Sequence, residues 1–228
     1  MFDGKFRAPV DKAITPVGNA LRRTGLTPDH LTVVGLLVGI GAAVAIGSGR
    51  LLLGLFLVVL AALPDLLDGA LAKASDASSQ RGAFFDSTVD RVTDAFLLGG
   101  IAWYLASEES PHMSLLPFAV MAVSSIISYQ RAKAESLGID AKGGLMERAE
   151  RIIAICLGLL FPVLLIPILW VMLALTTITA IQRFVKVWRQ AAVAPVTAER
   201  IEMRRSRRQS RRVARVERRR TRVPRRPL

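Results

Sequence analysis

Cysteine and histidine are nearly absent from this chain of 228 residues, and their scarcity excludes several kinds of site. Cys156 is the only cysteine and sits in an apolar run, which excludes a disulfide framework and a thiolate metal site. The two histidines, His30 and His112, are isolated, which argues against a histidine metal site and against a Ser/His/Asp triad. Strand-like alternation of useful length is also missing, so helices are the expected elements.

Both ends of the chain differ from its middle. Residues 1–23 lack the continuous apolar core of a cleavable signal peptide. Their apolar side chains instead recur every three or four positions among basic ones, which predicts a helix lying on an anionic membrane surface. Residues 200–228 carry fourteen arginines and two glutamates, a net +12 of the total +13. We expect a disordered tail that binds anionic lipids, and the lack of aromatic rings there argues against nucleic acid.

Long apolar runs fill the middle of the chain, and about 20 apolar residues cover the core of a bilayer. The predicted membrane spans begin near residues 31, 51, 82, 114, 152 and 168 and end near 48, 65, 105, 129, 165 and 181. The sequence therefore predicts an all-α integral membrane protein with six transmembrane helices after an N-terminal interfacial helix. Its expected parts are residues 1–24, 25–190 and 191–228. Lysine and arginine concentrate in alternate connections and at both ends, which places both termini on the cytoplasmic side of the cell membrane.

Four aspartates stand at the ends of two of these predicted helices. Asp65 and Asp68 are three residues apart, and Asp86 and Asp90 are four apart, so each pair lies on one face of a helix. Carboxylates beside apolar spans are costly unless a cation neutralises them. Oxygen donors suit hard cations such as Mg²⁺ or Mn²⁺, and four carboxylates can hold two ions for displacement at a phosphate ester. A carboxylate less committed to metal can take the proton of an attacking hydroxyl.

The spacing of these residues resembles the signature of the CDP-alcohol phosphotransferase family. It reads D-x-x-D-G-x-x-A-K over residues 65–73 and G-x-x-x-D-x-x-x-D over residues 82–90. The resemblance implies a six-helix homodimer that moves a phosphatidyl group from CDP-diacylglycerol onto an alcohol and releases CMP. It implies Asp90 as general base, Asp65, Asp68, Asp86 and Asp90 as metal ligands, and Asp68, Gly69, Ala72, Lys73 and Gly82 as contacts to CDP. Lys73 stands where the family has arginine, and lysine lacks the planar two-point contact of a guanidinium.

Basic residues in the second half bear on the acceptor alcohol. Each residue alone is typical of the cytoplasmic end of a membrane helix, whereas the residues together can form a pocket for an anion. The set is Arg131, Lys133, Arg148, Arg151 and Arg183. Residues 5–190 also resemble the actinobacterial phosphatidylinositol phosphate synthases, in which basic residues at the positions of Arg131, Arg151 and Arg183 are thought to bind the phosphate of inositol phosphate. Arg131 replaces their usual lysine, and Lys133 replaces an arginine. The resemblance favours inositol 1-phosphate as acceptor, and glycerol 3-phosphate is the alternative because it suits the same cations.

Two hypotheses from other classes stay open. The first is a divalent-cation transporter, because carboxylates within membranes often mark ion paths. All four aspartates stand at one end of their helices, however, and nothing acidic continues that path through residues 97–101. The second is a non-catalytic membrane anchor that recruits partners with its arginine-rich tail.

Overall fold

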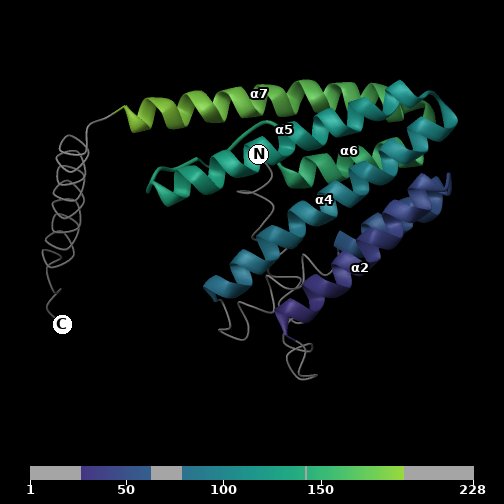
Figure 1. Cartoon of the computed structure of the whole chain (residues 1–228), viewed down its shortest axis with the longest axis horizontal. Helices are drawn as coiled ribbons and strands as arrows, with labels where there is room; N and C mark the ends of the chain where they lie inside the picture. The colour runs from purple at the N-terminus through teal and green to yellow at the C-terminus, as the bar shows by residue number, and fades with distance from the viewer. Residues whose placement is uncertain (1–26, 63–78, 142, 193–228) are drawn as a thin grey trace, which may run out of the picture. The chain divides into compact units, whose positions relative to one another are not determined.

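The computed structural model describes residues 27–62, 79–141 and 143–192, in which every regular element is helical (Figure 1). The α-helices are α2 (Pro28–Gly47), an unlabelled helix over Leu51–Ala62, α4 (Gln80–Glu108), α5 (Leu115–Ser136), α6 (Arg148–Leu160) and α7 (Leu165–Ala191). Two short 3₁₀ turns, η1 (Pro111–Ser114) and η2 (Pro162–Leu164), precede α5 and α7. The chain divides into two compact units, residues 1–184 and 185–228, and the core and the site described below belong to the first.

Three of the described helices are long and apolar enough to cross a membrane, over Asp29–Gly47, Pro111–Ser136 and Pro162–Ala191. The Leu51–Ala62 helix is apolar but shorter. α6 is also short, and α4 carries several charges in its first half. The all-helical prediction is thus confirmed for the described residues, while the count of six transmembrane helices stays a prediction.

Local sequence explains where several helices begin and end. α2 begins with a capping box in which the Thr27 hydroxyl accepts from the His30 N–H and the His30 ring accepts from the Thr27 N–H. Ser79 caps α4 by accepting from the Gly82 N–H at 2.9 Å. The predicted fifth span covers residues 152–165 and contains Pro162, and α6 ends at Leu160 because this proline cannot continue a helix.

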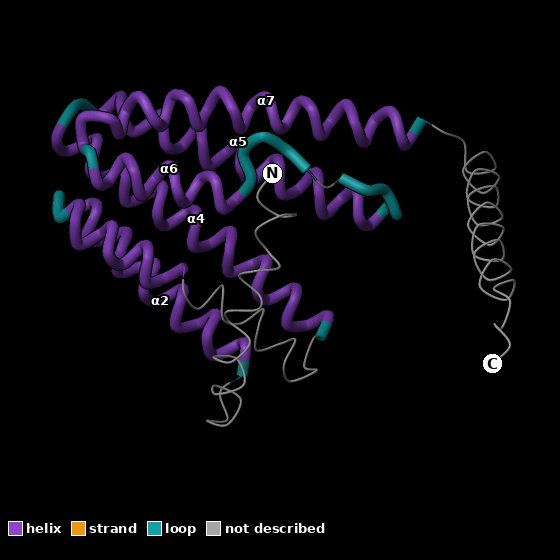
Figure 2. The backbone as a smooth tube through the Cα atoms, turned by 180° about the vertical axis from the view of Figure 1, so that it is seen from behind, coloured by secondary structure: helices purple, strands orange, loops and turns teal. Residues whose placement is uncertain are grey.

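Close contacts between small residues set how α2 packs against α4, which lie side by side in both views (Figures 1 and 2). A Cβ atom on Gly100 would lie 2.4 Å from the carbonyl oxygen of Ala43. The backbones of the two helices are therefore in direct contact, which only a glycine at position 100 permits. Gly47, one turn beyond Ala43, receives the ring of Trp103 in the same way. Such stripes of small residues let membrane helices approach closely.

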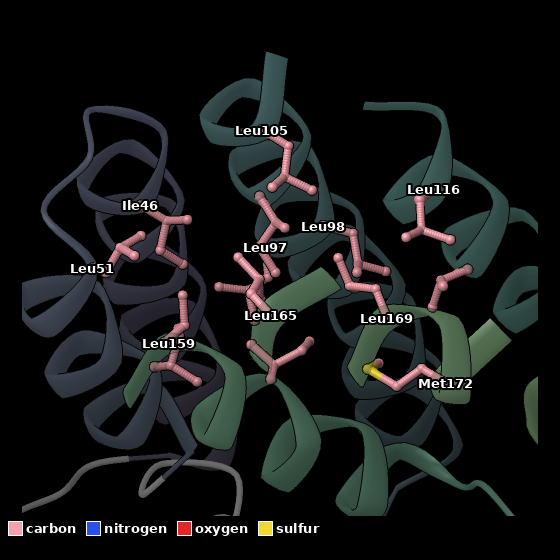
Figure 3. Packing of buried hydrophobic residues seen from close by; sticks show 14 of the residues in the cluster. Ile46, Leu51, Leu97, Leu98, Leu105, Leu116, Leu159, Leu165, Leu169 and Met172 are labelled. Atoms are coloured by element: carbon pink, nitrogen blue, oxygen red, sulfur yellow. The ribbon is translucent and has the colours of Figure 1, made fainter. Parts of the chain in front are cut away.

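The apolar core joins residues from all of these helices (Figure 3). Fully buried members include Ile46, Ile101, Leu105, Leu159, Leu165, Leu169 and Met172. Large apolar side chains also cover the outside: Leu37 is 62% exposed, Phe56 63% and Val163 90%. Exposed apolar surface on this scale is unfavourable in water and suits contact with lipid.

Candidate active site

The first half of α4 carries an acidic face. Asp86, Asp90 and Asp94 follow one another at four-residue steps, so they line one side of the helix. The carboxyl groups of Asp90 and Asp94 are only 17% and 14% exposed. Asp86 and Asp90 were expected from the motif, whereas Asp94 was not identified from the sequence. The sequence feature that could have identified Asp94 is its spacing, four residues after Asp90.

Two arginines in the first turns of α6 pair with this face. Arg148 Nη1 lies 2.6 Å from Asp90 Oδ1, and Arg151 Nη2 lies 2.6 Å from Asp94 Oδ2. Arg148 also reaches toward Asp94, with Nε 3.7 Å from Oδ1. The four side chains therefore form a ladder in which Arg148 touches both acids. Burial of these charges is tolerable because each one has an opposite charge beside it.

Arg91 connects the ladder to α5. Its guanidinium lies 3.7 Å from Asp90 Oδ2 and donates to the hydroxyl of Ser128. Asp90 thus has a guanidinium on each of its two oxygens. Opposite charges on both sides offset the cost of burying this carboxylate and fix its orientation.

Arg183 of α7 is 4% exposed and ties together three parts of the chain. Nη1 donates to the carbonyl of Ile127 on α5, and Nη2 donates to the carbonyl of Gly143, both at 3.0 Å. Nη2 also lies 3.6 Å from Glu147, the N-cap residue of α6. One turn earlier, Thr179 accepts from the N–H groups of residues 145 and 146 at 3.2 Å. α7 therefore fixes the connection that leads into Arg148.

The other two cations expected at the acceptor site lie on the exposed end of α5. Arg131 pairs with Glu135 at 3.0 Å, and both side chains are about half exposed. Lys133 lies in the last turn of the helix and is exposed. Of the five predicted cations, the structure therefore brings Arg148 and Arg151 directly to the acidic face and leaves Arg131 and Lys133 at the surface.

Part of the predicted site lies outside the described residues. This part comprises Asp65, Asp68, Gly69, Ala72 and Lys73. Gly82 is described, and a Cβ atom there would lie 3.2 Å from the Ser79 hydroxyl and 3.8 Å from Asp29 on α2. Within residues 27–62, 79–141 and 143–192, no three metal-binding side chains gather. Asp86 and Asp90 nevertheless offer oxygen donors one helical turn apart, the donor chemistry that a hard divalent cation takes.

The family model for CDP-alcohol phosphatidyltransferase matches residues 25–189, and the chain belongs to this family of membrane enzymes. Among its relatives is the phosphatidylinositol phosphate synthase of Mycobacteroides abscessus, 38% identical over 152 residues that cover 66% of this chain and 69% of that protein. The archaetidylinositol phosphate synthase of Methanothermobacter thermautotrophicus is 35% identical over 198 residues, covering 82% and 94%.

Solved structures of a relative share the fold. The chain matches the Mycobacterium tuberculosis phosphatidylinositol phosphate synthase with CDP-DAG bound at a TM-score of 0.72 and 32% identity, covering 78% of this chain and 94% of that one. The same enzyme in complex with manganese and citrate matches at 0.72 and 31% identity, covering 77% and 88%. The predicted family and the predicted class of enzyme are confirmed, and the transporter and anchor hypotheses are not favoured.

Proposed function

We propose that this protein transfers the phosphatidyl group of CDP-diacylglycerol to inositol 1-phosphate, giving phosphatidylinositol phosphate and CMP. The observation that carries the proposal is the ladder of Asp90, Asp94, Arg148 and Arg151. In this ladder, carboxylates that could accept a proton lie beside guanidinium groups that could bind a phosphate. This arrangement supports phosphoryl transfer to a phosphorylated alcohol. The names and the CDP-DAG complex of the relatives point to the same pair of substrates.

The metal-binding role falls to the aspartates of the motif. Asp86 and Asp90, with Asp65 and Asp68, would hold divalent ions, two per site, of magnesium or manganese. Divalent ions held by these residues would supply positive charge that offsets the charge of the CDP-lipid phosphates. The tuberculosis enzyme has been solved in complex with manganese, which supports a divalent cation as the cofactor.

Asp90 is the proposed general base. It takes the proton from the acceptor hydroxyl as the hydroxyl oxygen bonds to the β-phosphorus and the bond from that phosphorus to CMP breaks. Arg91 and Arg148 hold its carboxylate in place from two sides. The residues that would contact the CDP moiety, as the family motif implies, are Asp68, Gly69, Ala72, Lys73 and Gly82.

The acceptor's phosphate is proposed to bind the basic residues beside the ladder. Arg148 and Arg151 bring two guanidinium groups, each with five N–H donors, to the acidic face. Arg131 and Lys133 add positive charge from the end of α5. Arg183 completes the predicted set, and its carbonyl contacts give it a second task, which is to hold the connection before α6.

The surrounding architecture belongs to the same proposal. Six helices would cross the cell membrane, with the site and both termini on the cytoplasmic side, and two copies would form a homodimer. Residues 1–24 would lie on the membrane surface, residues 25–190 would form the catalytic domain, and residues 191–228 would bind anionic lipids.

A panel of acceptors tests the function. The purified protein is given CDP-diacylglycerol and Mg²⁺ with inositol 1-phosphate, glycerol 3-phosphate, inositol or serine, and CMP release is measured. We expect the highest kcat/KM with inositol 1-phosphate. Product formed only with glycerol 3-phosphate would reject the proposed acceptor and favour a phosphatidylglycerophosphate synthase. Activity with unphosphorylated alcohols alone would reject the anion pocket.

A further inference from the structure

Asp94 lies one turn beyond Asp90 on α4 and outside the eight positions of the family motif. We propose that Asp94 is a positioning residue that holds Arg151 and Arg148 in place to receive the phosphate of the acceptor. This inference rests on the proposed function, because it assigns a further residue to the same site.

The contacts of Arg151 give the first argument. Its side chain is 5% exposed, and its Nη2 donates to Asp94 Oδ2 at 2.6 Å. Within the part of the chain that the structure describes, Asp94 is the only acid paired with it. A buried guanidinium without its carboxylate is strongly unfavourable, so the location of Asp94 decides where Arg151 can lie.

The ladder geometry gives the second argument. Asp90 and Asp94 are one turn apart on α4, while Arg148 and Arg151 are three residues apart on α6, so the two rungs align. Arg148 sits between the acids, at 2.6 Å from Asp90 and 3.7 Å from Asp94. Asp94 thereby also influences the guanidinium that touches the proposed base.

The surroundings of the Asp94–Arg151 pair give the third argument. Both residues line one small cavity whose other walls are apolar and come from α4, α6 and α7. Leu97, Ile155 and Met172 are among these walls. The apolar walls offer Arg151 no other charged partner, so its guanidinium is held where Asp94 lies.

Positioning and simple charge balance predict opposite effects of Asp94→Asn. Removal of a negative charge beside two arginines should, by Coulomb attraction alone, strengthen the binding of a phosphate and lower KM. Loss of positioning should weaken it, because a misplaced guanidinium loses a charge-assisted hydrogen bond. We expect KM for inositol 1-phosphate to rise about tenfold, the effect of one such bond, and KM for CDP-diacylglycerol to stay near its wild-type value.

The experiment compares full-length wild type, Asp94→Asn, Asp94→Glu and the matched control Glu108→Gln in the same detergent. Glu108→Gln removes one negative charge from the exposed far end of α4. Asp94→Glu keeps the charge but moves the carboxylate by one methylene group and so displaces Arg151, and its KM should therefore fall between those of wild type and Asp94→Asn. The control should match wild type. Thermal unfolding and binding of CDP-diacylglycerol report whether each variant is folded.

The outcomes separate this inference from the proposed function. A raised acceptor KM in a folded Asp94→Asn, with weaker competitive inhibition by inorganic phosphate, supports positioning. An unchanged or lowered KM overturns it and leaves the proposed function intact. Should Asp94→Asn not fold, Asp94→Glu decides, because a KM equal to that of wild type would then overturn the inference. The same KM comparison applies if glycerol 3-phosphate proves to be the acceptor, whereas a wild type that uses only unphosphorylated alcohols overturns both proposals.

Discussion

The two halves of α4 are held in place by different interactions. In residues 80–94, Asp90 and Asp94 of the acidic face are paired with arginines from α4 and α6. In residues 95–108, apolar side chains such as Ile101 and Leu105 are fully buried, and Gly100 touches the backbone of α2. Charge pairing across the first half contributes little net stability, because desolvation opposes it, whereas apolar packing in the second half contributes much.

This contrast teaches where mutations should affect activity and where they should affect stability. A carboxylate in the first half can be replaced by its amide with little change in volume, so the helix should persist while chemistry is lost. A glycine at the helix contact of the second half cannot gain a methyl group without moving a backbone. The following experiments test that division.

The largest effect is expected from Asp90→Asn, which keeps the shape of the side chain and removes the proposed base. Turnover should fall by about 10²–10⁴-fold, the usual contribution of a general base. Binding of CDP-diacylglycerol should weaken far less than turnover, because three proposed metal ligands remain. The unfolding midpoint should change little, because Arg148 still has Asp94 beside it. CMP release at saturating substrate concentrations measures turnover. A lipid-binding assay and thermal unfolding measure CDP-diacylglycerol binding and the unfolding midpoint. Wild-type turnover in this variant would exclude Asp90 as the base, and Glu109→Gln at the other end of α4 serves as control.

The second largest effect is expected from Arg183→Met. This residue is an exception to the contrast between charged and apolar regions, because its buried charged side chain is expected to stabilise the fold. Loss of two charge-assisted bonds to the carbonyls of Ile127 and Gly143 should lower the free energy of unfolding by about 3–5 kcal/mol. Arg183→Lys retains the charge but not the fork that reaches both carbonyls, so its loss should be smaller. Unfolding by denaturant or heat in detergent measures both. Equal midpoints for wild type and Arg183→Met would contradict the anchoring role.

A smaller effect is expected at the contact of α2 with α4. Gly100→Ala would place a methyl group 2.4 Å from the Ala43 carbonyl oxygen and should destabilise the protein by about 1–3 kcal/mol, as overpacking usually does. Gly99→Ala is the matched control, because a Cβ atom there meets nothing within 4 Å. The control should be neutral or slightly stabilising, since alanine favours helices. Equal unfolding midpoints for the two variants would remove the evidence for close helix contact.

The smallest effect is expected from Glu135→Gln on the exposed end of α5. Its partner Arg131 is about half exposed, so the pair is well hydrated. Exposed pairs of this kind contribute less than about 1 kcal/mol, and salt screens them. The unfolding midpoint should therefore hardly move at low or high salt. A loss comparable with that of Arg183→Met would show that α5 depends on surface charge.

The sequence allowed prediction of the helices and of two of the three aspartates on the acidic face. Apolar runs are visible without tertiary contacts, and Asp86 and Asp90 stand out by their spacing. Asp94 was missed because its partner Arg151 lies 57 residues away, and no local pattern joins them. Arg183 was expected as a phosphate-binding cation, and its carbonyl acceptors on α5 and in the next connection arise only from tertiary packing. Such contacts depend on how helices meet, which spacing along one chain does not encode.

The close contact of Gly100 with Ala43 also determines where the aspartates earlier in α4 lie. It fixes both the rotation of α4 and its height along α2. Inserting a single residue between Asp94 and Gly100 would turn the acidic face by about 100° and shift it by about 1.5 Å. The carboxylates would then swing away from α6 while every side chain kept its identity. The site therefore depends on the number of residues between the aspartates and Gly100 as well as on the aspartates themselves.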